Sequence, residues 1–212
     1  MNQSFAKEFI SSLNPLKVNI LNNPYIFNNV RRLIAGNQLQ TKLFVKKYIN
    51  TYKCKSIIDI CSGTGDFSSL IDKDISYLGI DDNQNFINYA KNRYKMDKNK
   101  LFKKADILNQ ASFTGEKFDA VILISTMHHF SDRELDTLFE IVKKITNKIV
   151  IIADIIPNPP RLLQKIFVKL DQGKYIRTEK DKIKILKRYF KIINKVIIPS
   201  RLAIQYGIVC EV

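Results

Sequence analysis

Two glycines, one residue apart, follow an apolar run in the stretch SIIDICSGTGDF, which begins at Ser56. Because Gly63 and Gly65 have no side chains, the backbone there can approach a ligand closely, and a helix that begins next presents free N–H groups. A complete dinucleotide fingerprint, G-x-G-x-x-G, has a third glycine where this chain has Ser68. The turn predicts a nucleotide-like ligand; a tight strand-to-helix connection is the alternative.

An acidic residue, Asp81, ends the next apolar run, YLGID. A carboxylate at the end of the second strand can accept hydrogen bonds from both hydroxyls of a ribose. The alternative role is a helix N-cap, which the neighbouring Asp82 or Asn83 supplies equally well. We favour the ribose role, because the strand end and the glycine turn lie at the same edge of a parallel sheet.

The only two histidines, His128 and His129, follow a later apolar run. Histidine takes up a proton near neutral pH, so both are candidate catalytic bases for an acceptor that is a hydroxyl or an acidic carbon. The alternative is that they pack against a cofactor or cap the helix that begins near Ser131.

The elements that must position these residues alternate along the middle of the chain. We expect strands at 56–61, 76–81, 101–105, 118–124 and 148–154, and helices at 66–71, 85–94 and 132–145. Strands alternating with helices predict an α/β fold, with a parallel sheet covered on both faces.

The flanking segments have a different pattern. Residues 1–50 favour helices, and the run IIPNPP after Asp154 breaks the pattern before helical stretches at 161–170 and 178–189. Two extended runs, 192–199 and 202–212, predict an antiparallel hairpin on the sheet edge.

The net charge of +15 is concentrated in the flanks. Residues 1–56 carry a net charge of +8 and residues 159–212 of +9, whereas residues 57–158 carry −2. Basic flanks attract nucleic acid, an anionic surface or an acidic substrate. A general bias toward lysine, which supplies 27 of the 35 basic residues, explains them equally well.

The three cysteines form no metal-binding spacing, so we expect no metal site, and their odd number suits a reducing compartment. No apolar run reaches the roughly 20 residues that span a bilayer, and the first residues lack a signal-peptide pattern. We therefore expect a cytoplasmic protein without a transmembrane segment; the sequence leaves its oligomeric state open.

Four stretches in order, IIDICSGTGDF, YLGIDDNQNFINYAKNR, KKADILN and FDAVILISTMHHFSD, resemble the class I S-adenosylmethionine-dependent methyltransferases over about residues 56–154. More weakly, NNPYIFNNVRRLIAG and LDQGKYIRT resemble a bacterial small-molecule subgroup related to the ubiquinone and menaquinone methyltransferases. The resemblance implies a Rossmann-like, seven-stranded, mostly parallel sheet of order 3-2-1-4-5-7-6. It also implies one domain over 1–212: a helical lid at 1–50, a cofactor-binding core at 56–154, a helical insert at 155–190 and a hairpin at 191–212.

The same resemblance implies a role for each matching residue. The methionine half of S-adenosylmethionine lies along Asp59 and the turn from Cys61 through Gly63 to Gly65. The ribose is bound by Asp81, and the adenine lies beside Asp82, Asp106 and Ile107. The transferring methyl group lies next to Ser125 and Thr126. Cys61 departs from the family, which has glycine there, and we interpret it as a buried, inert thiol.

Four residues of the flanks are candidates for the substrate side. Tyr25 and Arg31 belong to the helical lid, where an arginine can pair with the carboxylate of the cofactor; a solvated helix face is the alternative. Tyr175 and Arg177 lie in QGKYIRT, which can equally be a turn leading into a helix capped by Thr178.

We therefore expect an enzyme that methylates a small-molecule acceptor at oxygen or carbon. A nucleic-acid methyltransferase, using the basic flanks, is the less favoured hypothesis. Two more distant hypotheses are a non-catalytic module that binds a cofactor or partner and a nicotinamide dehydrogenase. The sequence does not identify the acceptor.

Overall fold

The computed structural model describes residues 22–36, 38–109, 115–162, 164, 165, 168, 173–200 and 204–212. The helical lid predicted at 1–50 and the helical stretch predicted at 161–170 lie partly outside these residues. The division of the chain into a cap, a core, an insert and a hairpin stays a prediction.

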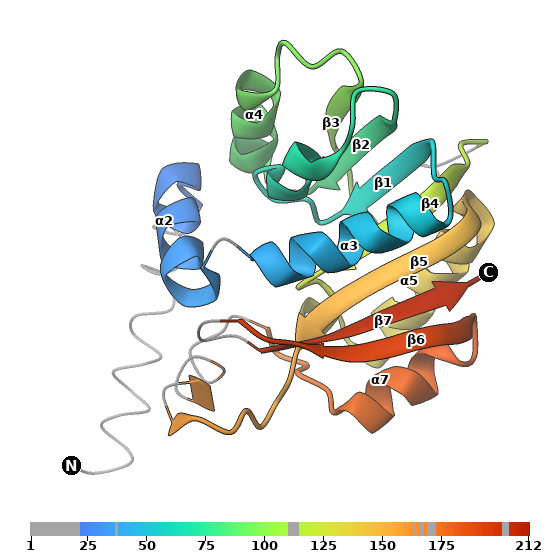
Figure 1. Cartoon of the computed structure of the whole chain (residues 1–212). Helices are drawn as coiled ribbons and strands as arrows, with labels where there is room; N and C mark the ends of the chain where they lie inside the picture. The colour runs from blue at the N-terminus through green and yellow to red at the C-terminus, as the bar shows by residue number, and fades with distance from the viewer. Residues whose placement is uncertain are drawn as a thin grey trace.

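Seven strands form one sheet in the order β3-β2-β1-β4-β5-β7-β6 (Figure 1). Neighbours among β1 to β5 run parallel, whereas β7 runs antiparallel to both β5 and β6. The predicted sheet and its strand order are confirmed. The strands are β1 Ser56–Ile60, β2 Ser76–Asp81, β3 Lys100–Lys104, β4 Phe118–Ile124, β5 Thr146–Ile155, β6 Lys191–Ile198 and β7 Gln205–Glu211.

The helices cover both faces of this sheet, as the alternating pattern predicted (Figure 1). One face packs against α3, η1 and α4, and the other packs against α5 and α7. Because helices cover both faces, the central strands β1, β4 and β5 are almost wholly buried and carry apolar side chains on both sides. The helices are α2 Pro24–Ala35, α3 Leu39–Thr51, α4 Gln84–Arg93, α5 Asp132–Ile145 and α7 Glu179–Leu186, and η1 Asp66–Leu70 and η3 Met127–His129 are 3₁₀ helices.

Local sequence signals set the ends of these helices. Ser131 and Glu134 form a capping box at the start of α5, and the side chain of Asn83 accepts from two backbone N–H groups at the start of α4. The side chain of Thr178 caps α7 in the same way. The helix predicted at 66–71 is a short 3₁₀ helix, because Ser68 and Ile71 donate their backbone N–H groups to carbonyls three residues back.

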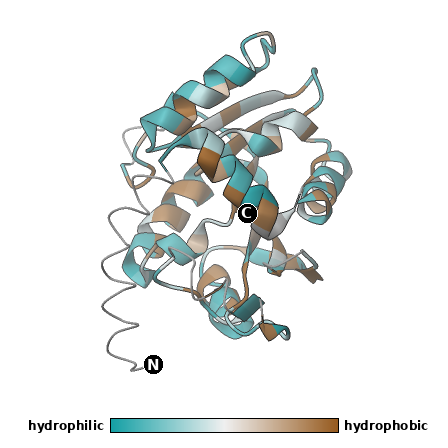
Figure 2. Cartoon of the chain, turned by 90° about the vertical axis from the view of Figure 1, so that its left-hand side faces the viewer, coloured by the Kyte–Doolittle hydropathy of each residue, from teal (hydrophilic) through white to brown (hydrophobic). Residues whose placement is uncertain are grey.

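Helix α2 buries the polar side chain of Asn28, half-buries that of Arg31 and leaves several apolar residues exposed. Asn28 is buried, and Arg31 is held by an ion pair, whereas Ile26, Val30 and Leu33 are exposed. The view from the α2 side shows hydrophobic and hydrophilic segments alternating on this surface (Figure 2). The inward face of α2 therefore makes polar contacts with the core.

Among the described residues, no helix is long and apolar enough to cross a membrane.

Candidate functional site

The turn between β1 and η1 adopts the left-handed backbone conformation at three residues. The φ angles are 60° at Cys61, 55° at Gly63 and 73° at Gly65. A Cβ atom added at Gly65 lies 2.7 Å from Cε1 of Phe102, whereas one added at Gly63 meets nothing closer than Phe27 at 3.9 Å. Gly65 is therefore required by packing as well as by φ, and Gly63 leaves open space beside the backbone.

Asp81, the last residue of β2, is bound to this turn. Its Oδ2 accepts from the backbone N–H of Gly63 at 2.8 Å, and its Oδ1 accepts from the backbone N–H of Asn83 at 2.9 Å. Burial raises the pKa of Asp81 even though both N–H donors favour the charged form. Each carboxylate oxygen still has a lone pair with which to accept from a hydroxyl of a ligand.

Asp59 lies in β1, below the turn, and is almost fully buried. Its Oδ2 accepts from the hydroxyl of Tyr77 at 2.5 Å. Burial raises the pKa of Asp59 to about 7, aided by the charges of Asp81 and Asp66 and opposed by the Tyr77 hydrogen bond. The side chain of Asp59 therefore joins β1 to Tyr77 of β2; its predicted contact with the cofactor stays a prediction.

Cys61 carries a side chain in a conformation that favours glycine. Burial and the neighbouring carboxylates of Asp81, Asp82 and Asp59 raise the pKa of its thiol well above the ordinary value. A thiol that stays protonated is a poor nucleophile, which agrees with its interpretation as inert.

The other predicted adenine contacts lie at the ends of β2 and β3. Asp82 is exposed directly after β2. Asp106 is also exposed, and its Oδ1 accepts from the backbone N–H of Leu108 at 2.9 Å, while Ile107 is buried in the core. All three follow the carboxyl ends of β2 and β3, which are parallel neighbours in the sheet.

The end of β4 is held by a buried hydrogen-bond chain. Ser125 has a φ of 53°, and its hydroxyl accepts from Nε2 of Gln205 at 2.8 Å. Oε1 of Gln205 in turn accepts from the hydroxyl of Thr41 at 2.7 Å. The hydroxyl of Thr126 donates to the main chain, to the carbonyl of Ile124 at 3.1 Å. Side chains from α3 and β7 therefore orient the residue predicted to lie beside the methyl group.

The two histidines occupy different environments. The Nδ1 atom of His128 is hydrogen-bonded to Oδ1 of Asp154 at the end of β5, and both side chains are buried. His129 is exposed, and the centroid of its ring lies 4.2 Å from that of the His128 ring. A Cβ atom added at Gly173 lies only 2.0 Å from Cδ2 of His128, so the chain packs closely over His128.

A buried lysine completes the surroundings of Asp154. Lys182 donates to the carbonyl of Ile155, and its Nζ lies 3.9 Å from Oδ2 of Asp154. Burial opposes ionisation of Asp154, but the charges of His128 and Lys182 outweigh it and hold the pKa of Asp154 below its ordinary value. The result is a buried charged cluster that joins η3, β5 and α7.

The segment before α7 is fastened to the histidine loop by Arg177. This buried guanidinium donates to the carbonyls of Met127 at 2.9 Å and Phe130 at 2.7 Å, and to Oδ1 of Asp132 at 2.6 Å. Tyr175 is exposed, and its backbone N–H donates to the carbonyl of His128 at 3.0 Å. Arg177 thus faces protein carbonyls; its predicted contact with a substrate has no support in this geometry.

Helix α2 lies along the glycine turn. Asn28 accepts from the hydroxyl of Thr64 at 2.7 Å, and NH1 of Arg31 lies 3.2 Å from Oδ2 of Asp66. Among the described residues, the buried Nδ2 of Asn28 has no hydrogen-bond partner. The predicted position of this helix over the turn agrees with these contacts, although Arg31 is already paired.

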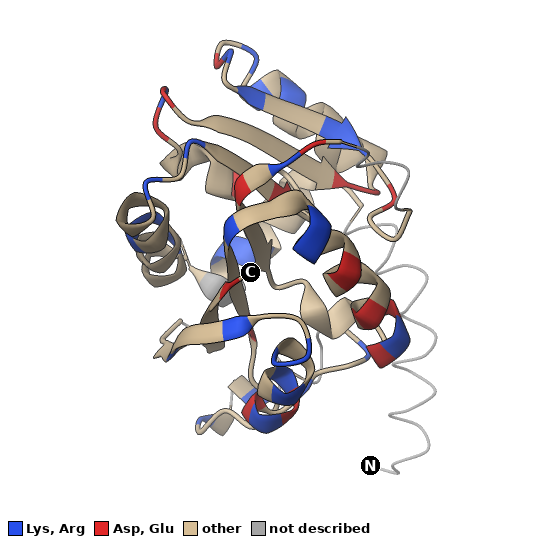
Figure 3. Cartoon of the chain, turned by 90° about the vertical axis from the view of Figure 1, so that its right-hand side faces the viewer, with Lys and Arg blue, Asp and Glu red and all other residues tan. Residues whose placement is uncertain are grey.

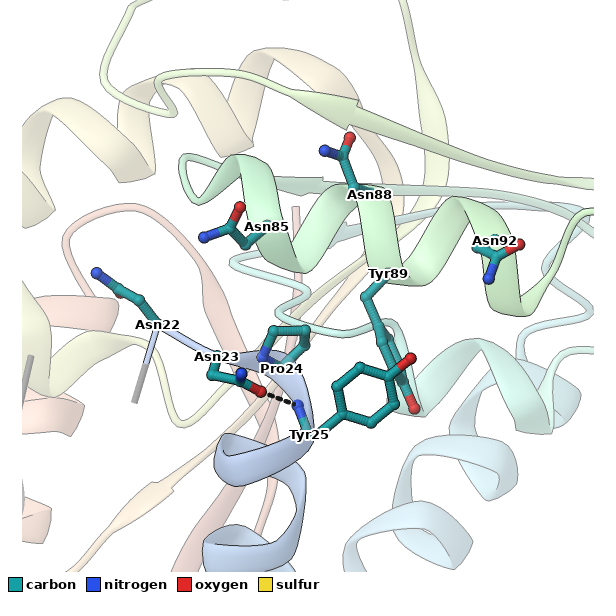
Figure 4. A pocket seen from close by; sticks show the side chains of 8 residues that line it. All are labelled: Asn22, Asn23, Pro24, Tyr25, Asn85, Asn88, Tyr89 and Asn92. Carbon is teal, nitrogen blue, oxygen red and sulfur yellow. Dashed lines mark hydrogen bonds between the residues drawn. The ribbon is translucent and has the colours of Figure 1, made fainter. Parts of the chain in front are cut away.

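Tyr25 lies farther from the turn, at the start of α2. Its exposed ring meets that of Tyr89 edge-on at 5.2 Å, in a groove of about 420 Å³ between α2 and α4 (Figure 4). The lining is uncharged: Asn22, Asn23, Pro24, Tyr25, Asn85, Asn88, Tyr89 and Asn92. Tyr25 therefore faces this outer groove rather than the end of β4.

The profile of the family described as "Methyltransferase domain" matches residues 57–148. These residues include the glycine turn, Asp81 and the end of β4. By this match, residues 57–148 form a methyltransferase domain. No curated protein sequence is similar enough to the chain to count as a match.

Solved structures share the methyltransferase fold at low sequence identity. Magnesium protoporphyrin IX methyltransferase from Synechocystis PCC 6803, with bound SAH, is 18% identical, with a TM-score of 0.66 over 82% of this chain and 83% of its own. The methyltransferase domain of bacterial CtHen1 is 19% identical, with a TM-score of 0.68 over 83% of this chain and 100% of its own. N-methyltransferase NodS from Bradyrhizobium japonicum WM9 is 15% identical, with a TM-score of 0.65 over 82% of this chain and 94% of its own.

We predict that Gly65→Ala destabilises the fold by about 2 to 4 kcal/mol, because the left-handed φ and the collision with Phe102 both add cost. Gly115→Ala is the matched control, because Gly115 has a φ of 80° and a Cβ atom added there meets nothing within 4 Å. We expect this variant to lose only about 1 kcal/mol of folding stability. Urea denaturation measures both, and equal losses contradict a packing role for Gly65.

We predict that Asp59→Asn stabilises the methyltransferase above pH 7. A carboxyl whose pKa is raised to about 7 binds more protons when folded than when unfolded, so the wild type loses stability as the pH rises from about 4 to about 7. The asparagine variant lacks this loss and is more stable at pH 8 by on the order of 1 to 3 kcal/mol. Urea denaturation at pH 5 and pH 8 measures the difference; an unchanged pH dependence contradicts the assignment.

Proposed function

We propose that this methyltransferase binds S-adenosylmethionine across the glycine turn and transfers its methyl group to a small-molecule acceptor, at oxygen or carbon. The observation that carries the proposal is the hydrogen bond between Asp81 and Gly63, which holds at the turn a carboxylate that can accept from ribose hydroxyls. The open space at Gly63 and the Nδ2 atom of the buried Asn28, which has no partner among the described residues, agree with a ligand beside the turn.

Each part of the cofactor has its own set of residues. The ribose hydroxyls donate to Asp81, and the adenine lies beside Asp82, Asp106 and Ile107. The methionine half follows the backbone from Cys61 to Gly65, with the amide of Asn28 close by. The cofactor supplies a methyl group on a positively charged sulfur, which leaves as a neutral thioether, so the main task of the chain is alignment.

An acceptor hydroxyl must lose a proton as its oxygen bonds to the methyl carbon. We propose His129 as the candidate base, because its ring is exposed beside the end of β4. His128, whose Nδ1 is bound to Asp154, is the positioning residue: it fixes the loop and packs against the ring of His129.

The surface favours a small acceptor over a nucleic acid. On the side of the chain shown in Figure 3, basic residues alternate with acidic ones along the ribbon. Many basic side chains form ion pairs, as Lys55 does with Asp74 and Arg188 with Asp136. A nucleic-acid enzyme is expected to gather basic and aromatic side chains around the mouth of its site.

Titration calorimetry with S-adenosylmethionine and its demethylated product tests the cofactor site. We expect both to bind, and Asp81→Asn to weaken both by about tenfold to a hundredfold, because an amide accepts the ribose hydroxyls less strongly than a carboxylate. Asp74→Asn, an exposed position before β2, is the matched control and leaves affinity unchanged. NAD is expected not to bind. Folded protein that binds neither methionine derivative overturns the proposal.

Transfer of a labelled methyl group tests the acceptor class. We expect the protein, given labelled S-adenosylmethionine, to label metabolites in a small-molecule extract and not to label RNA, and the labelling to fall in His129→Asn. Label that appears in RNA alone contradicts the small-molecule acceptor while keeping the methyltransferase activity.

A further inference from the structure

A second, smaller cavity lies where α2, α3, η1 and α4 meet. Its volume is about 130 Å³, which is room for about four water molecules. This space suits a single tetrahedral oxyanion and is too small for a nucleoside. The lining residues are Arg31, Arg32, Gly36, Lys42, Asp66 and Arg93.

The charges of this cavity do not balance. Asp66 is its single carboxylate, with Nζ of Lys42 at 2.8 Å, NH1 of Arg31 at 3.2 Å and NH1 of Arg93 at 3.7 Å. Arg32 adds a fourth positive charge, so the lining has an excess of three. The side chains of Arg31, Lys42 and Arg93 are partly withdrawn from water, so their mutual repulsion is screened less than on an open surface, whereas Arg32 is exposed at the rim. An added anion relieves this repulsion.

A buried donor in this lining is unsatisfied. Among the described residues, Nε of Arg31 has no hydrogen-bond partner, although NH1 and NH2 of the same guanidinium are engaged with Asp66 and Asn28. An unpaired buried N–H is costly. The guanidinium of Arg31 therefore keeps hydrogen-bonding capacity beyond its contacts with Asp66 and Asn28.

The cavity is separate from the ribose end of the cofactor site. Asp81 lies beside the first residues of α4, since it accepts from the N-cap Asn83, whereas Arg93 is the last residue of α4. The ten residues of α4 span about 15 Å. The contacts of α2 are separated in the same way. The ring of Phe27 lies beside Gly63, and Arg31, about one helical turn farther along α2, pairs with Asp66.

We propose that this cavity is an anion site that binds one phosphate-type oxyanion, either free phosphate or the phosphate group of a phosphomonoester. The bound anion joins Arg31 and Arg32 of α2, Lys42 of α3 and Arg93 of α4. It therefore fastens α2 over the glycine turn and stabilises the folded chain.

Thermal unfolding of the full chain in increasing inorganic phosphate tests the site, with sodium chloride adjusted to keep the ionic strength constant. We expect the melting temperature to rise with phosphate and to saturate. Glycerol 3-phosphate in place of phosphate separates the two sources: an equal rise identifies phosphomonoesters as ligands, and a rise with phosphate alone identifies the free ion.

Charge-removing variants locate the binding. We expect Arg93→Gln and Arg32→Gln each to weaken the apparent phosphate affinity about tenfold, the effect of one charge-assisted hydrogen bond. Lys46→Gln is the matched control on α3, because Lys46 is exposed and pairs with Asp72 outside the cavity. It keeps the wild-type response.

Removing the carboxylate gives a result in the opposite direction. Asp66→Asn raises the excess positive charge by one, so we expect this variant to melt lower without phosphate and to gain more from phosphate than the wild type does. If Asp66 has only a structural role, the variant has a lower melting temperature without phosphate, but phosphate raises it no more than in the wild type.

Three results overturn the proposal. One is a wild-type melting temperature that does not respond to phosphate at constant ionic strength. Another is an equal loss of response in Lys46→Gln. The third is displacement of phosphate by S-adenosylmethionine, which makes the cavity part of the cofactor site. The phosphate titration uses no cofactor, so its outcome is independent of the proposed methyl transfer.

Discussion

The hydrogen bond from the backbone N–H of Gly63 to the carboxylate of Asp81 is the contact on which the proposed cofactor site depends. It joins the turn after β1 to the end of the neighbouring strand β2. The turn itself is held from below, where Phe102 packs against Gly65, and from above, where Asn28 of α2 bonds to Thr64. A ligand that meets Asp81 therefore meets a backbone already placed for it, and little ordering remains to be done on binding.

The acceptor side is held by contacts between elements distant in sequence. Ser125 at the end of β4 is oriented through Gln205 of β7, and His128 is fixed by Asp154 of β5. Arg177 then fastens the segment before α7 to the same loop. Three separate elements thus converge on the loop after β4, where we propose that the two reactants are aligned.

Much of this architecture is predictable from the sequence, because its signals are local. Continuous apolar runs mark β1, β4 and β5, the capping box marks α5, and the two glycines mark the turn. The structure corrects η1, which is a 3₁₀ helix. The contacts of Asn28 with Thr64, of Asp154 with His128 and of Gln205 with Ser125 carry no local signal, because each joins residues far apart in the chain. An arginine such as Arg177 can bind a substrate, and only the fold shows that its guanidinium donates to backbone carbonyls instead.

A crystal structure of the protein with S-adenosylhomocysteine would show whether Asp81 and the glycine turn hold the cofactor. We expect both ribose hydroxyls within hydrogen-bond distance of Asp81, about 2.5 to 3.0 Å, and the sulfur atom beside Ser125 and Thr126. A ligand bound elsewhere, such as the groove between α2 and α4, with Asp81 bonded only to Gly63 and Asn83, contradicts this assignment.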